Sequence, residues 1–150
     1  MQFDPLTLQI IYRLTLAAVL GMFIGFEREW RGKPAGLRTY MLVTIGAALF
    51  TTVSIDVYHL YPSVNGVAGF DYHLVANIVV GIGFLGGGLI MQKGEHLEGL
   101  TTAAGLWVAA AIGMAVGFGF FIIATYTTIM VLVVLFGLRP FENYIHKDLQ

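Results

Sequence analysis

The sequence predicts an all-α, polytopic membrane protein, and three observations support that prediction. Hydrophobic residues make up 57% of the 150-residue chain, charged residues make up 11%, and the mean hydropathy is +0.80. Soluble domains are about 45–50% apolar and about 25% charged, so eight basic and nine acidic side chains are too few to cover a soluble surface. The apolar residues also fall into runs of about 20, the length of helix that crosses a bilayer core.

Five apolar segments are predicted to be transmembrane helices. Three of them are residues 6–26, 37–57 and 74–91, separated by a dense charged stretch and by a Gly- and Pro-containing loop over residues 59–72. After the short polar stretch 92–99, the apolar run 100–138 is about twice as long as one span. Gly117 and Gly119 mark a turn within it, which gives the fourth and fifth helices as a tight hairpin. The alternative is a hairpin that enters the membrane without crossing it.

Basic residues determine the expected orientation, because Lys and Arg are retained on the cytoplasmic side during insertion. In the five-span arrangement all basic residues except Arg13 lie on one side: Arg28, Arg31, Lys33, Arg38, Lys93, Arg139 and Lys147. The N-terminus is therefore expected outside and the C-terminus in the cytoplasm. No positive n-region or cleavage site precedes the first span, so it is expected to be a retained helix and not a signal peptide.

The composition also argues against several classes of protein. The chain has no cysteine, which excludes disulfides and thiolate metal sites, and its net charge of −1 argues against a nucleic-acid partner. It contains no serine-nucleophile motif, no pair of histidines at metal-ligand spacing on a helix and no phosphate-binding loop. We therefore expect a protein that is not an enzyme and that has no metal site and no cofactor.

Small residues recur at four-residue intervals in the first and fourth predicted helices. Such a spacing places them on one helix face, where they let neighbouring backbones approach closely. The predicted packing glycines are Gly21, Gly25, Gly105, Gly113 and Gly117. These faces are expected to pack helices within one chain, and the chain is also expected to form a homo-oligomer.

The third predicted helix is unusually rich in glycine, at Gly81, Gly83, Gly86, Gly87 and Gly88. The spacing matches the dinucleotide-binding pattern, but that pattern requires a preceding strand, and here it lies inside an apolar span. Two interpretations remain: tight packing against neighbouring helices, or a locally unwound helix that lines a binding site.

Two groups of polar residues are candidate sites. In the outer half of the membrane Arg13 is predicted to pair with Asp56, with Asn77 nearby, either as a structural ion pair or as a functional polar pocket. The cytoplasmic face carries a predicted anion or ligand site made of Glu27, Arg28, Arg31, Arg38, Thr101 and Thr102. There the second and fourth helices begin, and helix N-termini attract anions. The alternatives are that the basic residues only meet lipid headgroups, or that Glu27 offers a proton or cation site.

Three stretches together resemble the membrane domain of the MgtC/SapB family of bacterial inner-membrane proteins. They are residues 27–39 (EREWRGKPAGLRT), residues 81–88 (GIGFLGGG) and residues 99–107 (GLTTAAGLW), and the resemblance covers about residues 10–138. It implies a multi-pass inner-membrane protein connected with low magnesium, acid or host stress and, in some members, virulence. Residues 1–150 are expected to form a single transmembrane domain without the cytosolic C-terminal domain of longer members.

Two functions are consistent with this resemblance. The leading hypothesis is a regulator that binds other membrane proteins through helix contacts, and the family resemblance implies the F-type ATP synthase as a partner. The second hypothesis is a small transporter or channel for Mg²⁺, another cation or protons, which would use Arg13, Asp56, Asn77 and the glycine-rich helix.

Overall fold

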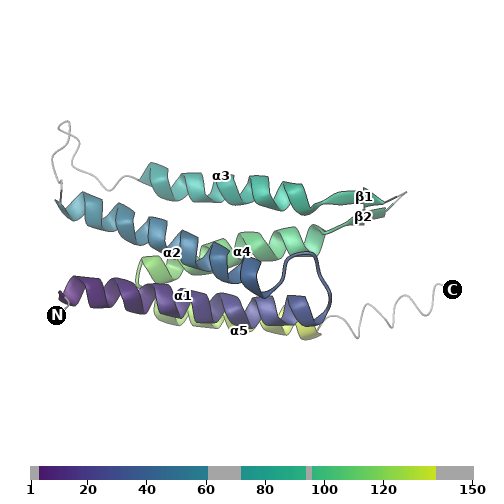
Figure 1. Ribbon diagram of the computed structural model, residues 1–150, viewed down its shortest axis with the longest axis horizontal. Helices are drawn as coiled ribbons and strands as arrows, with labels where there is room; N and C mark the ends of the chain where they lie inside the picture. The colour runs from purple at the N-terminus through teal and green to yellow at the C-terminus, as the bar shows by residue number, and fades with distance from the viewer. Residues whose placement is uncertain (1–3, 61–71, 94–95, 138–150) are drawn as a thin grey trace.

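The computed structural model describes residues 4–60, 72–93 and 96–137, and in them the chain forms an all-α bundle. Its helices are α1 (Pro5–Trp30), α2 (Leu37–Leu60), α3 (Tyr72–Leu89), α4 (Leu100–Gly117) and α5 (Phe121–Gly137). They alternate in direction, so that α1, α3 and α5 begin at one end and α2 and α4 at the other (Figure 1). The predicted helix bundle and its five helices are thus confirmed.

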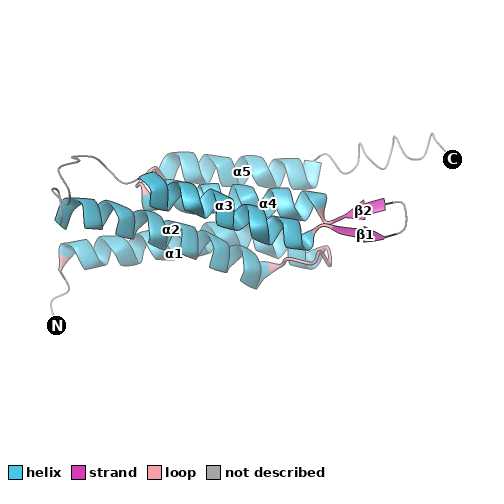
Figure 2. Ribbon diagram, turned by 90° about the horizontal axis from the view of Figure 1, so that it is seen from above, coloured by secondary structure: helices cyan, strands magenta, loops and turns pink. Residues whose placement is uncertain are grey.

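Helix α4 is central to the bundle. It packs against all four other helices, whereas α3 packs mainly on α4 and α2 and lies at an edge of the bundle (Figure 1). Figure 2 shows the same bundle from above, with every helix axis close to one common direction. Such an arrangement is typical of membrane bundles, where all helices cross the same layer.

Three helices are long and apolar enough to cross a membrane: α1, residues Leu37–Asp56 of α2, and α4. The apolar helices Val75–Leu89 and Phe121–Gly137 are shorter, at 10–17 residues. By length and composition the chain is therefore a membrane protein. Five complete spans and the sides on which the termini lie remain predictions.

Glycines allow α1, α2 and α4 to pack in close contact. A Cβ added at Gly25 of α1 would lie 2.7 Å from the Leu37 Cα, and one added at Gly117 of α4 would lie 2.6 Å from the Thr51 Cβ. An added Cβ at Gly21 of α1 or at Gly113 of α4 would likewise collide with Thr44 of α2. Because the obstacles include the α2 backbone, larger residues at these positions would push the helices apart.

The core at this triple contact is made of small side chains and threonines. Ala17, Ala48 and Ala109 are fully buried. The hydroxyl groups of Thr51 and Thr52 donate to carbonyl oxygens four residues earlier, at 2.8 Å each. The buried hydroxyls therefore need no partner from a neighbouring helix.

Two connections clarify the chain path. Helix α4 ends at Gly117, and Gly119 adopts a left-handed conformation with φ +85°, so the predicted turn before α5 is confirmed. The stretch 92–99, predicted only as a polar connection, includes most of a small antiparallel hairpin of β1 (Met91–Lys93) and β2 (His96–Glu98). The hairpin extends beyond the ends of α3 and α4 (Figure 2).

Helix α3 is continuous across its glycines, so the locally unwound alternative does not describe this structure. Gly86 is buried against Ala103 of α4, with an added Cβ 3.6 Å from the Ala103 Cβ. An added Cβ at the other four glycines would meet nothing within 4 Å. Among the five glycines, only Gly86 therefore packs against a neighbouring helix in the described part of the chain, and a Cβ there would make an ordinary van der Waals contact.

Candidate functional site

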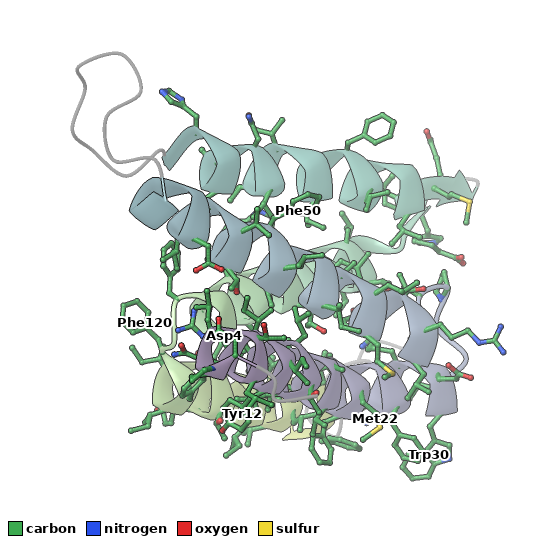
Figure 3. The ribbon with its side chains drawn as sticks, turned by 60° about the vertical axis from the view of Figure 1, so that its left-hand side comes forward. Asp4, Tyr12, Met22, Trp30, Phe50 and Phe120 are labelled. Carbon is green, nitrogen blue, oxygen red and sulfur yellow. The ribbon has the colours of Figure 1, made fainter. Side chains whose placement is uncertain are left out.

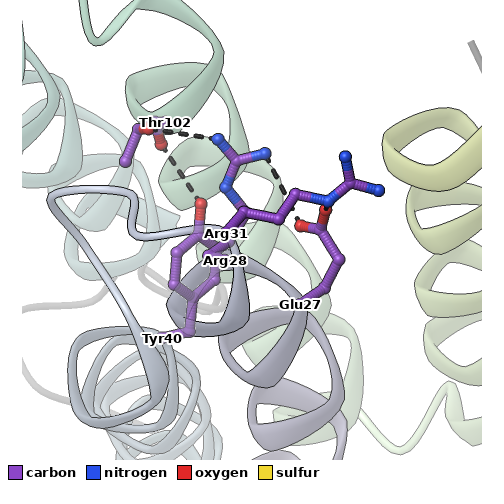
Figure 4. Close-up of polar contacts among 5 residues, drawn as sticks. All are labelled: Glu27, Arg28, Arg31, Tyr40 and Thr102. Atoms are coloured by element: carbon purple, nitrogen blue, oxygen red, sulfur yellow. Dashed lines mark hydrogen bonds and ion pairs between the residues drawn. The ribbon is translucent and has the colours of Figure 1, made fainter. Parts of the chain in front are cut away.

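A cluster of buried charged residues lies at the end of α1, near the start of α4 (Figure 4). Glu27 is 1% exposed and Arg28 is 4% exposed, while Arg31 is partly buried. Glu27 and Arg28 stand in the last turn of α1, and Arg31 directly follows the helix as its C-cap. The separation of four residues places Glu27 and Arg31 on the same side of the helix.

Glu27 is the shared anion of this cluster. Its carboxylate pairs with the Arg28 guanidinium at 3.5 Å and also with Nε of Arg31, four residues later. The Arg28 guanidinium donates a hydrogen bond to the Thr102 hydroxyl in the first turn of α4, at 3.3 Å. The ion cluster therefore connects α1 to α4 through Arg28.

Aromatic residues connect the cluster to two further helices. The Tyr40 hydroxyl of α2 donates to the backbone carbonyl of Thr102 at 3.3 Å, and this ring is fully buried. Gly105 gives the Tyr40 hydroxyl room, since a Cβ there would collide with it. The Arg31 guanidinium lies 5.2 Å from the centre of the Phe136 ring in α5, within cation–π range.

The cluster retains unused hydrogen-bonding capacity. Nε of Arg28 has no hydrogen-bond partner among the described residues, whereas Nε of Arg31 and both carboxylate oxygens of Glu27 take part in the ion pairs. Two guanidinium groups and one carboxylate leave a local excess of positive charge. The C-terminus of α1 adds a partial negative charge and the N-terminus of α4 a partial positive one, so the excess comes from the arginine side chains. The arrangement can therefore attract an anionic group.

A compact turn after α1 holds these residues in place. Gly32 has φ +61°, and the next residue, Lys33, donates its N–H to the Arg28 carbonyl at 3.0 Å. The Glu29 carboxylate then accepts the backbone N–H of Leu37 at 2.7 Å, which satisfies one free donor of the first turn of α2. The charged stretch that follows α1 thus has a structural role besides any functional one.

Two residues predicted for this site do not join the cluster. Arg38 and Thr101 are exposed, and neither makes a polar contact with the cluster within the described residues. The N-cap of α4 is Gly99, with φ +93°. Thr102 uses its hydroxyl to receive Arg28. Tyr40 also belongs to the site, but the sequence does not predict this role, because it depends on the tertiary contact of Tyr40 with Thr102.

Arg13, predicted for the outer half of the membrane, has a different partner from the expected one. Its Nη1 donates to the Gly117 carbonyl at 2.6 Å, at the end of α4. The last four carbonyls of a helix lack partners within it, so Arg13 satisfies one of them. Among the described residues no ion pair joins Arg13 to Asp56. Asn77 lies elsewhere, in the wall of a groove between α2 and α3.

That groove is a cavity between helices α2 and α3. It has a volume of about 600 Å³, and apart from Thr39 and Asn77 its lining is apolar. Phe50, one of its lining residues, lies on the side of α2 that faces α3 (Figure 3). The described residues contain no group of three or more His, Cys, Asp or Glu side chains that could hold a metal ion.

These features define a small helical membrane protein, with a glycine-packed interior and a buried ion cluster at one end. The chain belongs to the MgtC family, whose profile matches residues 14–144. No solved structure matches it.

Three relatives illustrate the similarity. The chain is 46% identical to protein slr0014 of Synechocystis over 92% of its length, which covers 56% of that relative. It is 43% identical to the Escherichia coli protein named "Putative magnesium transporter YhiD", over 87% of its length and 60% of the relative. It is 45% identical to MgtC of Salmonella typhimurium, over 81% of its own length and 49% of that relative. The chain thus spans about half to three-fifths of these curated relatives.

Proposed function

We propose that this chain is a non-enzymatic regulator in the bacterial inner membrane, which binds another membrane protein through α3 when magnesium is scarce. It crosses the membrane five times, with its N-terminus outside and its C-terminus in the cytoplasm. Membership of the MgtC family, and the reference to magnesium in the name of the relative YhiD, support a role at low magnesium. The outer face of α3 supports the mode of action.

One observation carries this proposal: α3 exposes a face that no described residue of the chain covers. Gly83 and Gly87 are four residues apart, and an added Cβ at either meets nothing within 4 Å. Val80 and Phe84 beside them are 70% and 83% exposed. Small residues at such spacing let a second helix approach the backbone closely, and this contact drives association where lipid supplies no hydrophobic force. The outer face of α3, defined by these four residues, therefore suits a partner helix.

The partner class follows from the position of this face within an apolar helix. A transmembrane helix of another protein is the expected ligand, with the F-type ATP synthase as the candidate that the family resemblance implies. A second copy of the chain is the alternative occupant. The buried ion cluster gives this regulator a place where an anionic ligand on the cytoplasmic face would alter the contact of α1 with α4.

Site-specific photo-cross-linking in cells tests the contact. A photoreactive residue at Val80 is expected to capture one discrete membrane protein, and Gly83→Leu with Gly87→Leu is expected to abolish that capture. A photoreactive residue at Ile122 of α5, which is 86% exposed, is the control and should capture lipid only. Capture that survives both glycine substitutions would contradict the proposed contact.

Transport of magnesium is the second candidate function, and the name of the relative, "Putative magnesium transporter YhiD", favours it. Purified protein in liposomes would then pass Mg²⁺, another cation or protons, and Asp56→Asn would abolish the flux. If the protein passes such ions and no partner is cross-linked, transport is the function and the regulatory proposal is wrong. Absence of flux together with capture from Val80 supports the regulator.

A further inference from the structure

The groove between α2 and α3 is a separate feature from the outer face of α3. Its α3 wall is formed by a set of residues that shares no member with that face: Asn77, Ile78, Gly81, Ile82 and Leu85. At about 100° per residue, Gly81 and Gly83 point to nearly opposite sides of the helix, and so do Leu85 and Gly87. The two surfaces can therefore be occupied and tested independently.

The dimensions of the groove fit one hydrocarbon chain. Along α2 it runs from Thr39 to Phe50, which is about 16 Å at about 1.5 Å per residue. One leaflet of a bilayer core is about 15 Å deep. A partner helix about 10 Å across and about 27 Å long would occupy about 2,000 Å³. The groove holds about 600 Å³, so a helix could only cover its mouth, whereas an extended acyl chain can enter.

The floor of the groove is apolar and closed. Ala47 and Ile82 are buried there and pack with Ala110 of α4 in one cluster. Leu42 and Phe50, which also line the groove, are 70% and 54% exposed, so it is open to the surrounding lipid. In the membrane this surface meets hydrocarbon and not water, so a chain that matches its shape is held by dispersion contacts.

The charge at one end of the groove indicates the headgroup. Arg38, an exposed cation in the first turn of α2, directly precedes Thr39 of the lining. The nearby Leu37 N–H is already bonded to Glu29, so attraction for a phosphate comes from the Arg38 side chain. We propose that the groove binds one acyl chain of an anionic phospholipid, whose phosphate pairs with Arg38.

Native mass spectrometry of the delipidated full chain in detergent tests this site. Titration with phosphatidylglycerol is expected to show one tightly bound lipid, and Gly46→Leu with Gly81→Leu should weaken its binding by about tenfold or more. The leucine side chains take up space that the acyl chain would fill, and steric overlap of this kind lowers affinity by about tenfold or more. An added Cβ at Gly46 or Gly81 meets nothing within 4 Å, so neither glycine holds two helices in close contact.

Three further variants make the outcome specific. Arg38→Gln should remove the preference for phosphatidylglycerol over phosphatidylcholine. Gly87→Leu, on the side of α3 away from the groove, should leave lipid binding unchanged, and so should Asn77→Leu, at the end of the groove far from Arg38. Equal lipid binding by wild type and the Gly46 and Gly81 double variant would overturn the proposal. Loss of lipid binding in Asn77→Leu alone would also overturn it. The same holds if the double variant loses a dimer while its lipid binding is unchanged.

Discussion

Replacing Glu27 with alanine tests the ion cluster most sharply. The substitution leaves Arg28, which is 4% exposed, without its carboxylate partner, although its hydrogen bond to Thr102 remains. Removing one partner of a buried ion pair costs about 3–5 kcal/mol of folding free energy. Arg31 is less buried and keeps the ring of Phe136, so we expect the lower end, about 3 kcal/mol.

Reversible unfolding in mixed detergent and SDS micelles, followed by far-ultraviolet circular dichroism, measures this loss. The control is Glu29→Ala, which removes an exposed carboxylate that caps the Leu37 N–H and should cost about 1 kcal/mol. Adding Arg28→Leu to Glu27→Ala removes the unpaired charge and should recover part of the stability. The reasoning is refuted if Glu27→Ala costs no more than the control, or if the double variant recovers nothing.

Three other predictions follow from the described contacts. Gly113→Ala forces a Cβ against the α2 backbone and should cost about 1–3 kcal/mol, whereas Gly46→Ala should be neutral or stabilising in the same unfolding assay. Tyr40→Phe removes the hydrogen bond to the Thr102 carbonyl and should cost about 0.5–1.5 kcal/mol, and no change would show that the bond contributes nothing. Arg13→Leu loses one hydrogen bond but also a costly charge in the membrane, so stability should stay nearly unchanged. Unchanged activity in that folded variant would contradict a functional outer pocket.

The helix bundle could be predicted because its signals are long. Runs of about 20 apolar residues identify membrane helices without any tertiary information. The turn at Gly119 could also be predicted, because glycine readily adopts the left-handed conformation that ends a helix. By contrast, β1 and β2 have three residues each, which is too short for an alternating pattern to stand out.

The polar contacts were harder to predict because their partners are not charged residues. Arg13 was expected to seek the carboxylate of Asp56, but it donates to the Gly117 backbone carbonyl, which no sequence pattern marks as an acceptor. Arg28 similarly uses Thr102 besides Glu27. Sequence spacing could place Glu27 and Arg31 on one helix face, but the distant contacts depend on how α1 packs against α4.

Growth at limiting magnesium tests the central claim, that the outer face of α3 acts on another membrane protein. A strain lacking this protein would be complemented with the wild type, with Gly83→Leu plus Gly87→Leu, or with Gly137→Leu, at the end of α5, as a control. All three glycines have open space around them, so each variant is expected to fold. We expect the double variant to fail at low magnesium while the wild type and the control restore growth. Full growth with the double variant, at equal protein levels, would contradict the claim.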